Sequence, residues 1–131
     1  MKPGIVIYDS ITGNTQSVAK IIAQEAGVDM VQVKDAPKNL ADYQLVVIGT
    51  PNIRAKPTQA IQAYLKTVSG LTRLAVFTTF GMPVWGQISS WVLFSYVIKN
   101  CPNTKIVERF YCPVFHRKYK TYPLRPAYRD F

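Results

Sequence analysis

The sequence predicts a doubly wound α/β fold, in which a five-stranded parallel sheet forms the middle layer of a three-layer sandwich. Two observations predict it. Short apolar runs alternate along the chain with segments whose apolar residues recur at the 3.6-residue period of a helix. The apolar runs lack the alternation of a half-exposed strand, so both of their faces are expected to be buried, as in parallel sheets. A length of 131 residues suits one domain with a single core.

The apolar runs and the periodic segments place the expected elements along the chain. Strands are expected over residues 4–8, 29–33, 44–48, 73–78 and 104–110. Helices are expected over residues 15–26, 58–68 and 87–99, with a short helix or turn over residues 37–41. Each of the first four strands is thus followed by a helical or turn segment, which predicts right-handed crossovers between parallel strands.

Each predicted helix is expected to bury its apolar face. The face of residues 15–26 would hold Val18, Ile21, Ile22 and Ala26. That of residues 58–68 would hold Ile61, Tyr64, Leu65 and Val68, with Thr58 as the N-cap. Residues 87–99 are apolar nearly all round, which is one face more than a monomer needs and favours a twofold dimer.

No helical period follows the fifth strand. Residues 111–131 contain Pro113, Pro123 and Pro126, so an irregular or extended tail is expected in place of a fifth helix. We therefore divide the chain into an α/β domain, residues 1–110, and a basic, aromatic tail, residues 111–131, that packs on the domain or extends from it. Because the sheet needs cover on both faces, the tail is expected to cover the face that lacks a helix.

The positive charge is concentrated in the last quarter of the chain. The net charge is +9, and residues 99–131 hold eight basic and two acidic side chains. This excess suits partner proteins with an acidic docking surface, or peripheral contact with an acidic membrane. The aromatic and basic tail is also compatible with RNA, but no RNP, KH or zinc pattern supports specific binding of nucleic acid. A solvated positive face remains the plainer explanation.

Other features limit the compartment and the chemistry. No uninterrupted apolar run reaches 18 residues, so no transmembrane segment is expected, and the N-terminus leaves no room for a signal peptide. Cys101 and Cys112 form no CxxC motif, and His116 stands alone. We expect reduced thiols, a cytoplasmic protein, an ordinary exposed imidazole and no metal site.

The stretch YDSITGNTQS, residues 8–17, joins the first strand to the first helix. Ser10, Thr12 and Thr15 supply hydroxyl donors, Gly13 permits a tight turn, and Asn14 tolerates left-handed geometry. With the backbone N–H groups of the helix N-terminus, this set can hold a dianionic phosphate. The lysine of a nucleotide P-loop is missing, which argues against triphosphate and Mg²⁺ chemistry. A helix start capped by small polar residues is the alternative.

A strand followed by S-x-T-G-N-T and an amphipathic helix resembles the FMN-phosphate loop of the flavodoxin family. The segment GTPNIRAKP, residues 49–57, is similar to the family's second flavin loop, and FTTFGMPVWG, residues 77–86, to its third. The resemblance covers residues 4–110 and implies FMN as the cofactor. It also implies these FMN-binding residues: Ser10, Ile11, Thr12, Gly13, Asn14, Thr15, Thr50, Pro51, Asn52, Ile53, Arg54, Thr79, Phe80, Gly81, Trp85 and Gly86.

The sequence departs from the family pattern at three places. Ile53 replaces an aromatic residue of the second loop, Met82 replaces an acidic residue of the third, and the final helix is absent. Trp85 is then the side chain expected to pack against the flavin. The alternative for Trp85 is a core tryptophan that opens the apolar helix.

The resemblance implies a flavoprotein that carries electrons between redox partners, with FMN doing the chemistry. No side chain looks like a dedicated substrate base, so no catalytic residue is expected. One alternative is a small FMN-dependent reductase or oxidase of the same fold, acting on quinones or protoporphyrinogen. Another is a basic module that binds an anionic partner.

Overall fold

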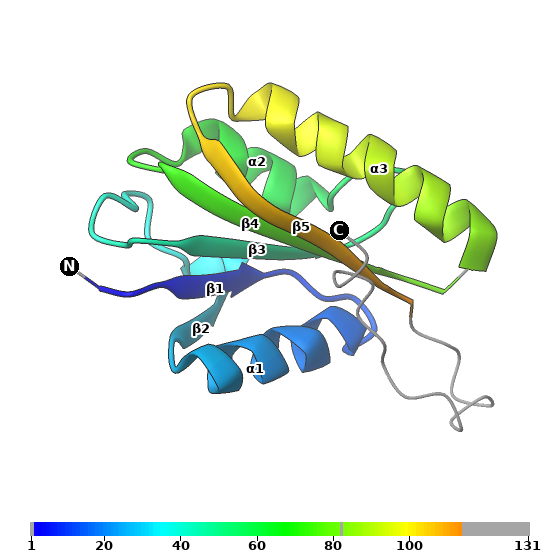
Figure 1. Ribbon diagram of the computed structural model, residues 1–131, viewed down its shortest axis with the longest axis horizontal. Coiled ribbons are helices and arrows are strands. Elements are labelled where there is room, and N and C mark those ends of the chain that lie inside the picture. The colour runs from blue at the N-terminus through cyan, green and yellow to red at the C-terminus, as the bar shows by residue number, and fades with distance from the viewer. Residues whose placement is uncertain (1, 82, 114–131) are drawn as a thin grey trace.

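A computed structural model describes residues 2–81 and 83–113 and contains a five-stranded parallel sheet between helices (Figure 1). The strand order is β2-β1-β3-β4-β5, which confirms the doubly wound fold. The predicted tail from residue 114 onward, His116 and Met82 lie outside the described residues. The elements in chain order are β1 (Ile5–Tyr8), α1 (Asn14–Ala26), β2 (Asp29–Gln32), the 3-10 turn η1 (Val33–Asp35), β3 (Val46–Pro51), α2 (Gln59–Thr67), β4 (Arg73–Phe80), α3 (Pro83–Asn100) and β5 (Lys105–Pro113).

The sheet has different cover on its two faces. Helices α2 and α3 lie on one face, and α1 lies on the other (Figure 1). Successive side chains of each strand point to opposite faces. Ile5 and Ile7 therefore pack on the side of α2 and α3, while Val6 packs on the side of α1. We call these surfaces the α2/α3 face and the α1 face.

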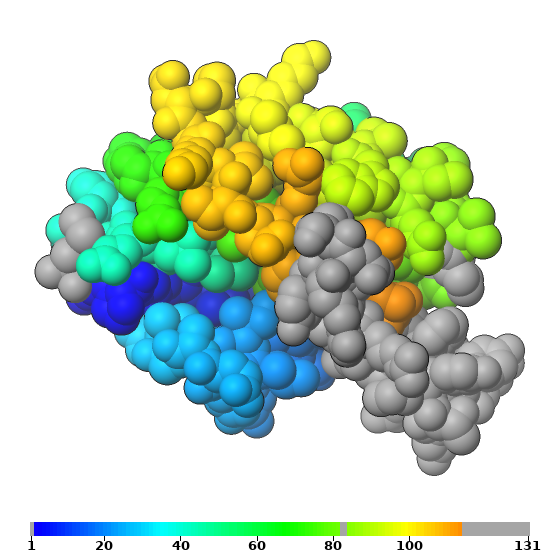
Figure 2. All heavy atoms as spheres, viewed as in Figure 1, coloured from blue at the N-terminus to red at the C-terminus, as the bar shows by residue number. Residues whose placement is uncertain are grey.

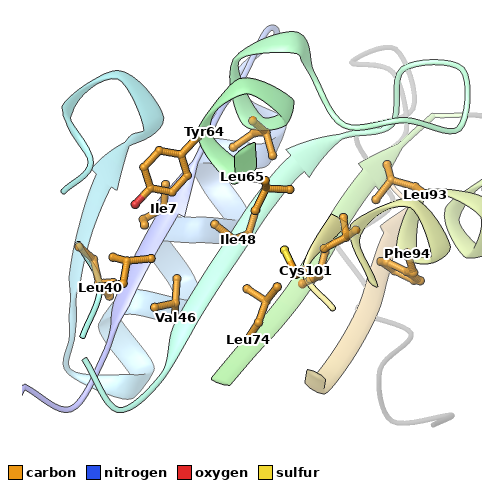
Figure 3. Close-up of a cluster of buried hydrophobic side chains, with 14 residues drawn as sticks. Ile7, Leu40, Val46, Ile48, Tyr64, Leu65, Leu74, Leu93, Phe94 and Cys101 are labelled. Atoms are coloured by element: carbon orange, nitrogen blue, oxygen red, sulfur yellow. The ribbon is translucent and has the colours of Figure 1, made fainter. Parts of the chain in front are cut away.

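The core of the α2/α3 face is closed by side chains from both of its helices. Figure 3 shows Tyr64 and Leu65 of α2 and Leu93 and Phe94 of α3 over the strands. The N-cap prediction for α2 is confirmed, because the Thr58 hydroxyl accepts a hydrogen bond from the Ile61 backbone N–H. The predicted buried face of this helix is also confirmed at Ile61, Tyr64 and Leu65.

Of the two alternatives for residues 37–41, the short helix is wrong, whereas a turn is present from Leu40 to Tyr43, where the Tyr43 N–H donates to the Leu40 carbonyl at 3.1 Å. The chain makes the single 3-10 turn η1 and then runs irregularly, with Asn39 bridging to Ser69. The Leu40 backbone N–H donates to the Ser69 carbonyl at 2.8 Å, and the Leu40 side chain is fully buried on the α2/α3 face. Pro37 lacks an N–H donor, and one buried leucine is too few apolar residues to stabilise a helix, so pairing with Ser69 prevails.

The buried side of α1 differs from the predicted one. Thr15, Val18, Ala19 and Ala23 are buried, whereas Ile21 is 52% exposed and Ala26 is exposed. The small side chains of Ala19 and Ala23 let the helix approach the sheet closely. Ile21 therefore turns sideways, toward a part of the α1 face that no other helix of the described chain covers.

Helix α3 begins at Pro83, four residues before the predicted start, and is apolar all round. Leu93, Phe94 and Val97 are buried against the sheet. The extra apolar face expected for this helix is confirmed by the exposed side chains of Val84, Trp85, Ile88, Trp91, Val92 and Ile98. The dimer inferred from that face stays a prediction. None of the helices in the described residues is long and apolar enough to cross a membrane.

Candidate functional site

The loops after β1, β3 and β4 meet at one edge of the sheet. All strands are parallel, so their carboxyl ends share this edge, and the strand order reverses between the neighbouring strands β1 and β3. Backbone hydrogen bonds join the loops: the Asp9 N–H donates to the Gly49 carbonyl at 3.1 Å, and the Asn52 N–H donates to the Thr79 carbonyl at 3.0 Å. The Thr15 and Thr79 hydroxyls lie 2.8 Å apart and are hydrogen-bonded. The edge is therefore a continuous, supported surface.

The first loop, residues 9–13, folds around the side chain of Ser10. The Ser10 hydroxyl oxygen accepts from the Gly13 N–H at 3.0 Å and from the Gln16 N–H at 3.4 Å. Gly13 has a φ of 92°, a left-handed conformation that costs glycine little. With both acceptor positions of Ser10 in use, its hydroxyl hydrogen stays free to donate to a ligand.

The N-terminus of α1 is open to an anion. Neither the Asn14 nor the Thr15 backbone N–H has a hydrogen-bond partner within residues 2–81 and 83–113. Gly13 has no side chain to cap the helix. Unpaired N–H groups at the positive end of a helix dipole attract negative charge. The first loop thus has the donors that a phosphate group requires.

The second loop contains a tight two-residue hairpin. Ile53 and Lys56 exchange backbone hydrogen bonds of 2.9 and 3.0 Å around Arg54 and Ala55. Arg54 and Ala55 have φ values of 52° and 68°, the left-handed region that favours glycine. The Asn52 side-chain oxygen accepts from the Ala55 N–H at 2.9 Å and supports this strained turn from inside. As a result, Ile53 and Arg54 stand at the exposed tip.

The second loop is tied to the start of α3 through the other end of the Asn52 amide. The Asn52 amide nitrogen donates to the Ser89 hydroxyl at 2.8 Å. Ser89 and Ser90 were not among the predicted site residues, although serines inside an otherwise apolar helix could have drawn attention to them. Gly86 is buried, and a Cβ there would lie 1.9 Å from the Phe80 ring, so Gly86 lets α3 pack on β4.

Each of the three loop regions exposes at least one large apolar side chain. Ile11 is 67% exposed, Ile53 41% and Trp85 56%. The alternative of a core tryptophan at position 85 is therefore wrong. Thr50, Thr79 and Phe80 lie buried beneath this edge, and Pro51 and Asn52 are half-buried. Exposed apolar groups above a polar, hydrogen-bonded floor are typical of a site for a flat aromatic ligand.

The titratable groups near this edge are few. Arg54 and Lys56 are exposed on the second loop. The Asp9 carboxylate accepts a hydrogen bond from the Ser10 backbone N–H at 3.0 Å. Both cysteines of the chain are free thiols, and burial raises the pKa of each, that of Cys112 to about 12. Neither thiol is thus an activated nucleophile. Within the described ranges, no three His, Cys, Asp or Glu side chains are grouped to hold a metal ion.

Comparisons with known proteins agree with this geometry. Residues 5–113 match the family model of a flavodoxin domain. A flavoprotein from Bacteroides uniformis superimposes with a TM-score of 0.71 at 17% identity, over 90% of this chain and 94% of that one. A flavoprotein from Lactobacillus acidophilus, solved in complex with FMN, gives 0.66 at 16% identity, over 83% and 92% of the two chains. A flavodoxin from the domain Archaea gives 0.64 at 17%, over 92% and 90%. No curated protein matches the sequence.

Proposed function

This chain belongs to the flavodoxin family, and from that membership we propose that it binds FMN at the three-loop edge and carries electrons between redox partner proteins. The observation that carries the proposal is the convergence of unpaired backbone donors and exposed apolar side chains where the strand order reverses. Bound FMN would supply reversible electron transfer. The protein's part is to hold the cofactor and to keep one edge of the ring accessible to partners.

The phosphate of FMN is assigned to the first loop. Its oxygens would accept from the Asn14 and Thr15 backbone N–H groups and from the Ser10 hydroxyl, whose own acceptor positions are filled. Thr12 is exposed and, within the described residues, its hydroxyl accepts one hydrogen bond, from the Asn14 side chain, so it is a further donor. Thr15 acts differently, since its buried hydroxyl pairs with Thr79 and fixes the loop against β4. A monophosphate needs no lysine here, because charge-assisted bonds contribute about 1.5–3 kcal/mol each.

The flavin ring is assigned to the second and third loops. Ile53 and Trp85 offer apolar surface on either side, and Arg54 and Lys56 bring positive charge. A cation near the ring stabilises the electron-rich reduced cofactor, on the order of 1–3 kcal/mol at an effective dielectric constant near 20. Arg54→Glu should therefore lower the midpoint potential of the bound flavin by tens of millivolts at low salt. A potential unchanged by this substitution would remove Arg54 from the site.

An electron carrier is favoured over an enzyme because the described edge offers no positioned acid or base. Its carboxylate, that of Asp9, already accepts the Ser10 N–H. The exposed cations Arg54 and Lys56 suit partners with an acidic docking surface. Saturable turnover of NAD(P)H with a quinone by the FMN-loaded protein would support the reductase alternative instead.

The binding proposal is tested by FMN titration, followed through quenching of the flavin fluorescence. Gly13→Val should raise the Kd for FMN at least tenfold, because valine cannot keep the left-handed φ that exposes the helix N-terminus. Gly27→Val is the matched control. Gly27 also has a positive φ and open space around it, but it lies at the other end of α1. The Kd of the Gly27→Val variant for FMN should therefore match that of the wild type. Absence of quenching at micromolar protein would refute the proposal.

A further inference from the structure

A groove of about 630 Å³ lies on the α1 face, and none of the residues predicted to bind FMN lines it. Helix α1 forms one wall, and the strands β3, β4 and β5 form the floor and the opposite wall. In Figure 2, the blue spheres of α1 and the orange spheres of β5 both belong to the side that faces the viewer. The lining residues are Val18, Ile21, Ile22, Glu25, Ala26, Leu45, Val47, Ala75, Glu108, Phe110 and Cys112.

We propose that residues 114–131 of the same chain bind in this groove and take the place of a second helix on the α1 face. The proposal concerns a surface distinct from the three-loop edge and does not depend on FMN binding. It names an intramolecular partner for an apolar surface that the described residues leave open.

The first argument is the apolar character of the groove. Ile21 is half exposed on α1 although isoleucine on a solvated helix face gains nothing there, and Val47 and Ala75 form the floor below it. Apolar patches of this kind on soluble domains are usually interaction sites. Residues 114–131 supply the matching side chains: Val114, Phe115, Tyr119, Tyr122, Leu124, Tyr128 and Phe131.

The second argument is the place where the described chain ends. Cys112 lines the groove, and β5 ends one residue later at Pro113. Along β5 the groove runs from Cys112 back to Glu108, a distance of about 13 Å at the rise of a strand. Residues 114–131 can extend to roughly 60 Å, so they reach every part of the groove.

The third argument is charge. The charged residues that line the groove are Glu25 and Glu108. The bulge in β5, where Ala75 pairs with Glu108 after Leu74 pairs with Ile106, turns Glu108 to this side of the sheet. Residues 114–131 carry five basic side chains against one acid, Asp130. A basic, aromatic segment therefore complements an apolar groove with acidic walls.

Residues 114–131 of the same chain are favoured over those of a second copy as the occupant of the groove, because a tethered segment has the higher local concentration. A tethered segment meets its site at an effective concentration of about a millimolar or more, well above that of a second copy in a micromolar solution. An exchange of tails between two copies would use the same contacts, and the experiment distinguishes the two arrangements.

The first test uses the full wild-type chain and zero-length carbodiimide cross-linking. A one-to-one mixture of ¹⁴N- and ¹⁵N-labelled protein separates links within one chain from links between chains by mass spectrometry. We expect links within one chain from Glu25 or Glu108 to Lys118 or Lys120. Links of these residues only between chains, or none while other surface carboxylates react, would overturn the proposal. The double variant Glu25→Gln, Glu108→Gln should abolish the assigned links.

The second test measures alkylation of Cys112 in the full chain. A variant with Phe115, Tyr119, Tyr122 and Leu124 changed to serine should react at Cys112 at least tenfold faster than the wild type. Cys101, on the α2/α3 face, is the internal reference, because its rate rises only if the whole protein unfolds. The matched control changes the exposed Val84, Ile88 and Val92 of α3 to serine and should leave the Cys112 rate unchanged. Equal Cys112 rates in all three proteins would overturn the proposal.

Discussion

The two faces of one sheet contrast in how completely they are covered. On the α2/α3 face, fourteen buried residues form one cluster closed by two helices and by Leu40 of the irregular segment before β3. On the α1 face, the described part of the chain contributes a cluster of ten buried residues and one covering helix, and a groove opens beside that helix. Both faces are lined by the same strands, so the strands themselves do not cause the difference.

The cause lies in the connections between strands. The segments after β3 and β4 form helices and cross over the α2/α3 face, and the segment after β2 adds Leu40 to it. Among the described connections between strands, only the one after β1 crosses the α1 face. Parallel sheets normally have cover on both faces. An apolar part of such a sheet that lies open therefore indicates where a further segment is expected to pack.

Alkaline pH should produce the largest effect that separates the faces. Burial raises the pKa of Cys112, on the α1 face, from 9.0 to about 12, and that of Tyr64, on the α2/α3 face, from 10.0 to about 12. A raised folded-state pKa means that the folded protein holds the proton longer than the unfolded chain. The stabilisation is full below the unfolded pKa and is lost as pH rises, by at most about 1.4 kcal/mol per pH unit and group.

Loss of stability should therefore begin near pH 9 through Cys112 and Cys101, and near pH 10 through Tyr64. Urea unfolding at each pH measures it. Cys112→Ser should reduce the decline that begins near pH 9, and the buried Cys101 thiol, whose pKa is also raised, accounts for the remainder. Tyr64→Phe should flatten only the part above pH 10. If Cys112→Ser leaves the profile unchanged, the Cys112 thiol is solvated and the α1 face is more open than its burial indicates.

The next largest effect compares neighbouring valines on opposite faces. Val46 packs under α2, and Val47 lines the groove. Val46→Ala should cost about 2–3 kcal/mol, the transfer energy of the lost methyl groups plus a cavity. With residues 114–131 in the groove, Val47→Ala should cost nearly as much in the full chain. A loss of about 1 kcal/mol or less for Val47→Ala, measured by urea unfolding, would mean that the groove stands open.

The order and kind of most elements followed from local patterns in the sequence. Alternating apolar runs and helical periods are local features, so β1 to β5 and the three helices were expected in the right places. The ends of β3, β4 and β5 lie two or three residues beyond the predicted ones. In β3 and β4 the added residues include Thr50 and Thr79, which are polar and yet almost fully buried. Burial of a threonine depends on neighbouring strands, which no local pattern contains. The same holds for the face that α1 buries, since Ala19 and Ala23 approach the sheet only in the folded chain.

The candidate site was predictable as three loops but not as a network. Loops at the carboxyl ends of parallel strands meet at one edge in any doubly wound sheet, so Ser10, Asn52 and Trp85 were expected to lie near it. The hydrogen bond from Asn52 to Ser89 joins residues 37 positions apart in the sequence. The turn at Arg54 and Ala55 has left-handed backbone conformations at positions where the sequence has neither glycine nor asparagine, so no local signal predicts it. Such contacts depend on tertiary structure that overrides local preference.

A smaller effect should separate two isoleucines of nearly equal exposure. Ile21 of α1 is 52% exposed and borders the groove, and Ile88 of α3 is 55% exposed on the outer side of its helix. If residues 114–131 cover Ile21, Ile21→Ser should cost about 1–1.5 kcal/mol through lost apolar contact. Ile88→Ser should stay within about 0.5 kcal/mol, as for ordinary surface sites. Equal unfolding free energies for the two variants would place Ile21 in solvent.

The smallest effect concerns how the helices of the two faces begin. The Thr58 hydroxyl caps α2 by accepting the Ile61 N–H at 3.4 Å, whereas α1 follows Gly13, and its Asn14 and Thr15 N–H groups, to which we assign the phosphate, have no partner among the described residues. Thr58→Ala should cost about 0.5–1 kcal/mol, since the hydrogen bond is long. FMN should raise the unfolding free energy of wild type and Thr58→Ala by the same amount, because the cap and the phosphate loop are independent sites. Paired urea titrations with and without FMN measure both quantities. A smaller FMN increment in Thr58→Ala would couple the two helix starts, and the N-terminus of α2 would then belong to the cofactor site as well.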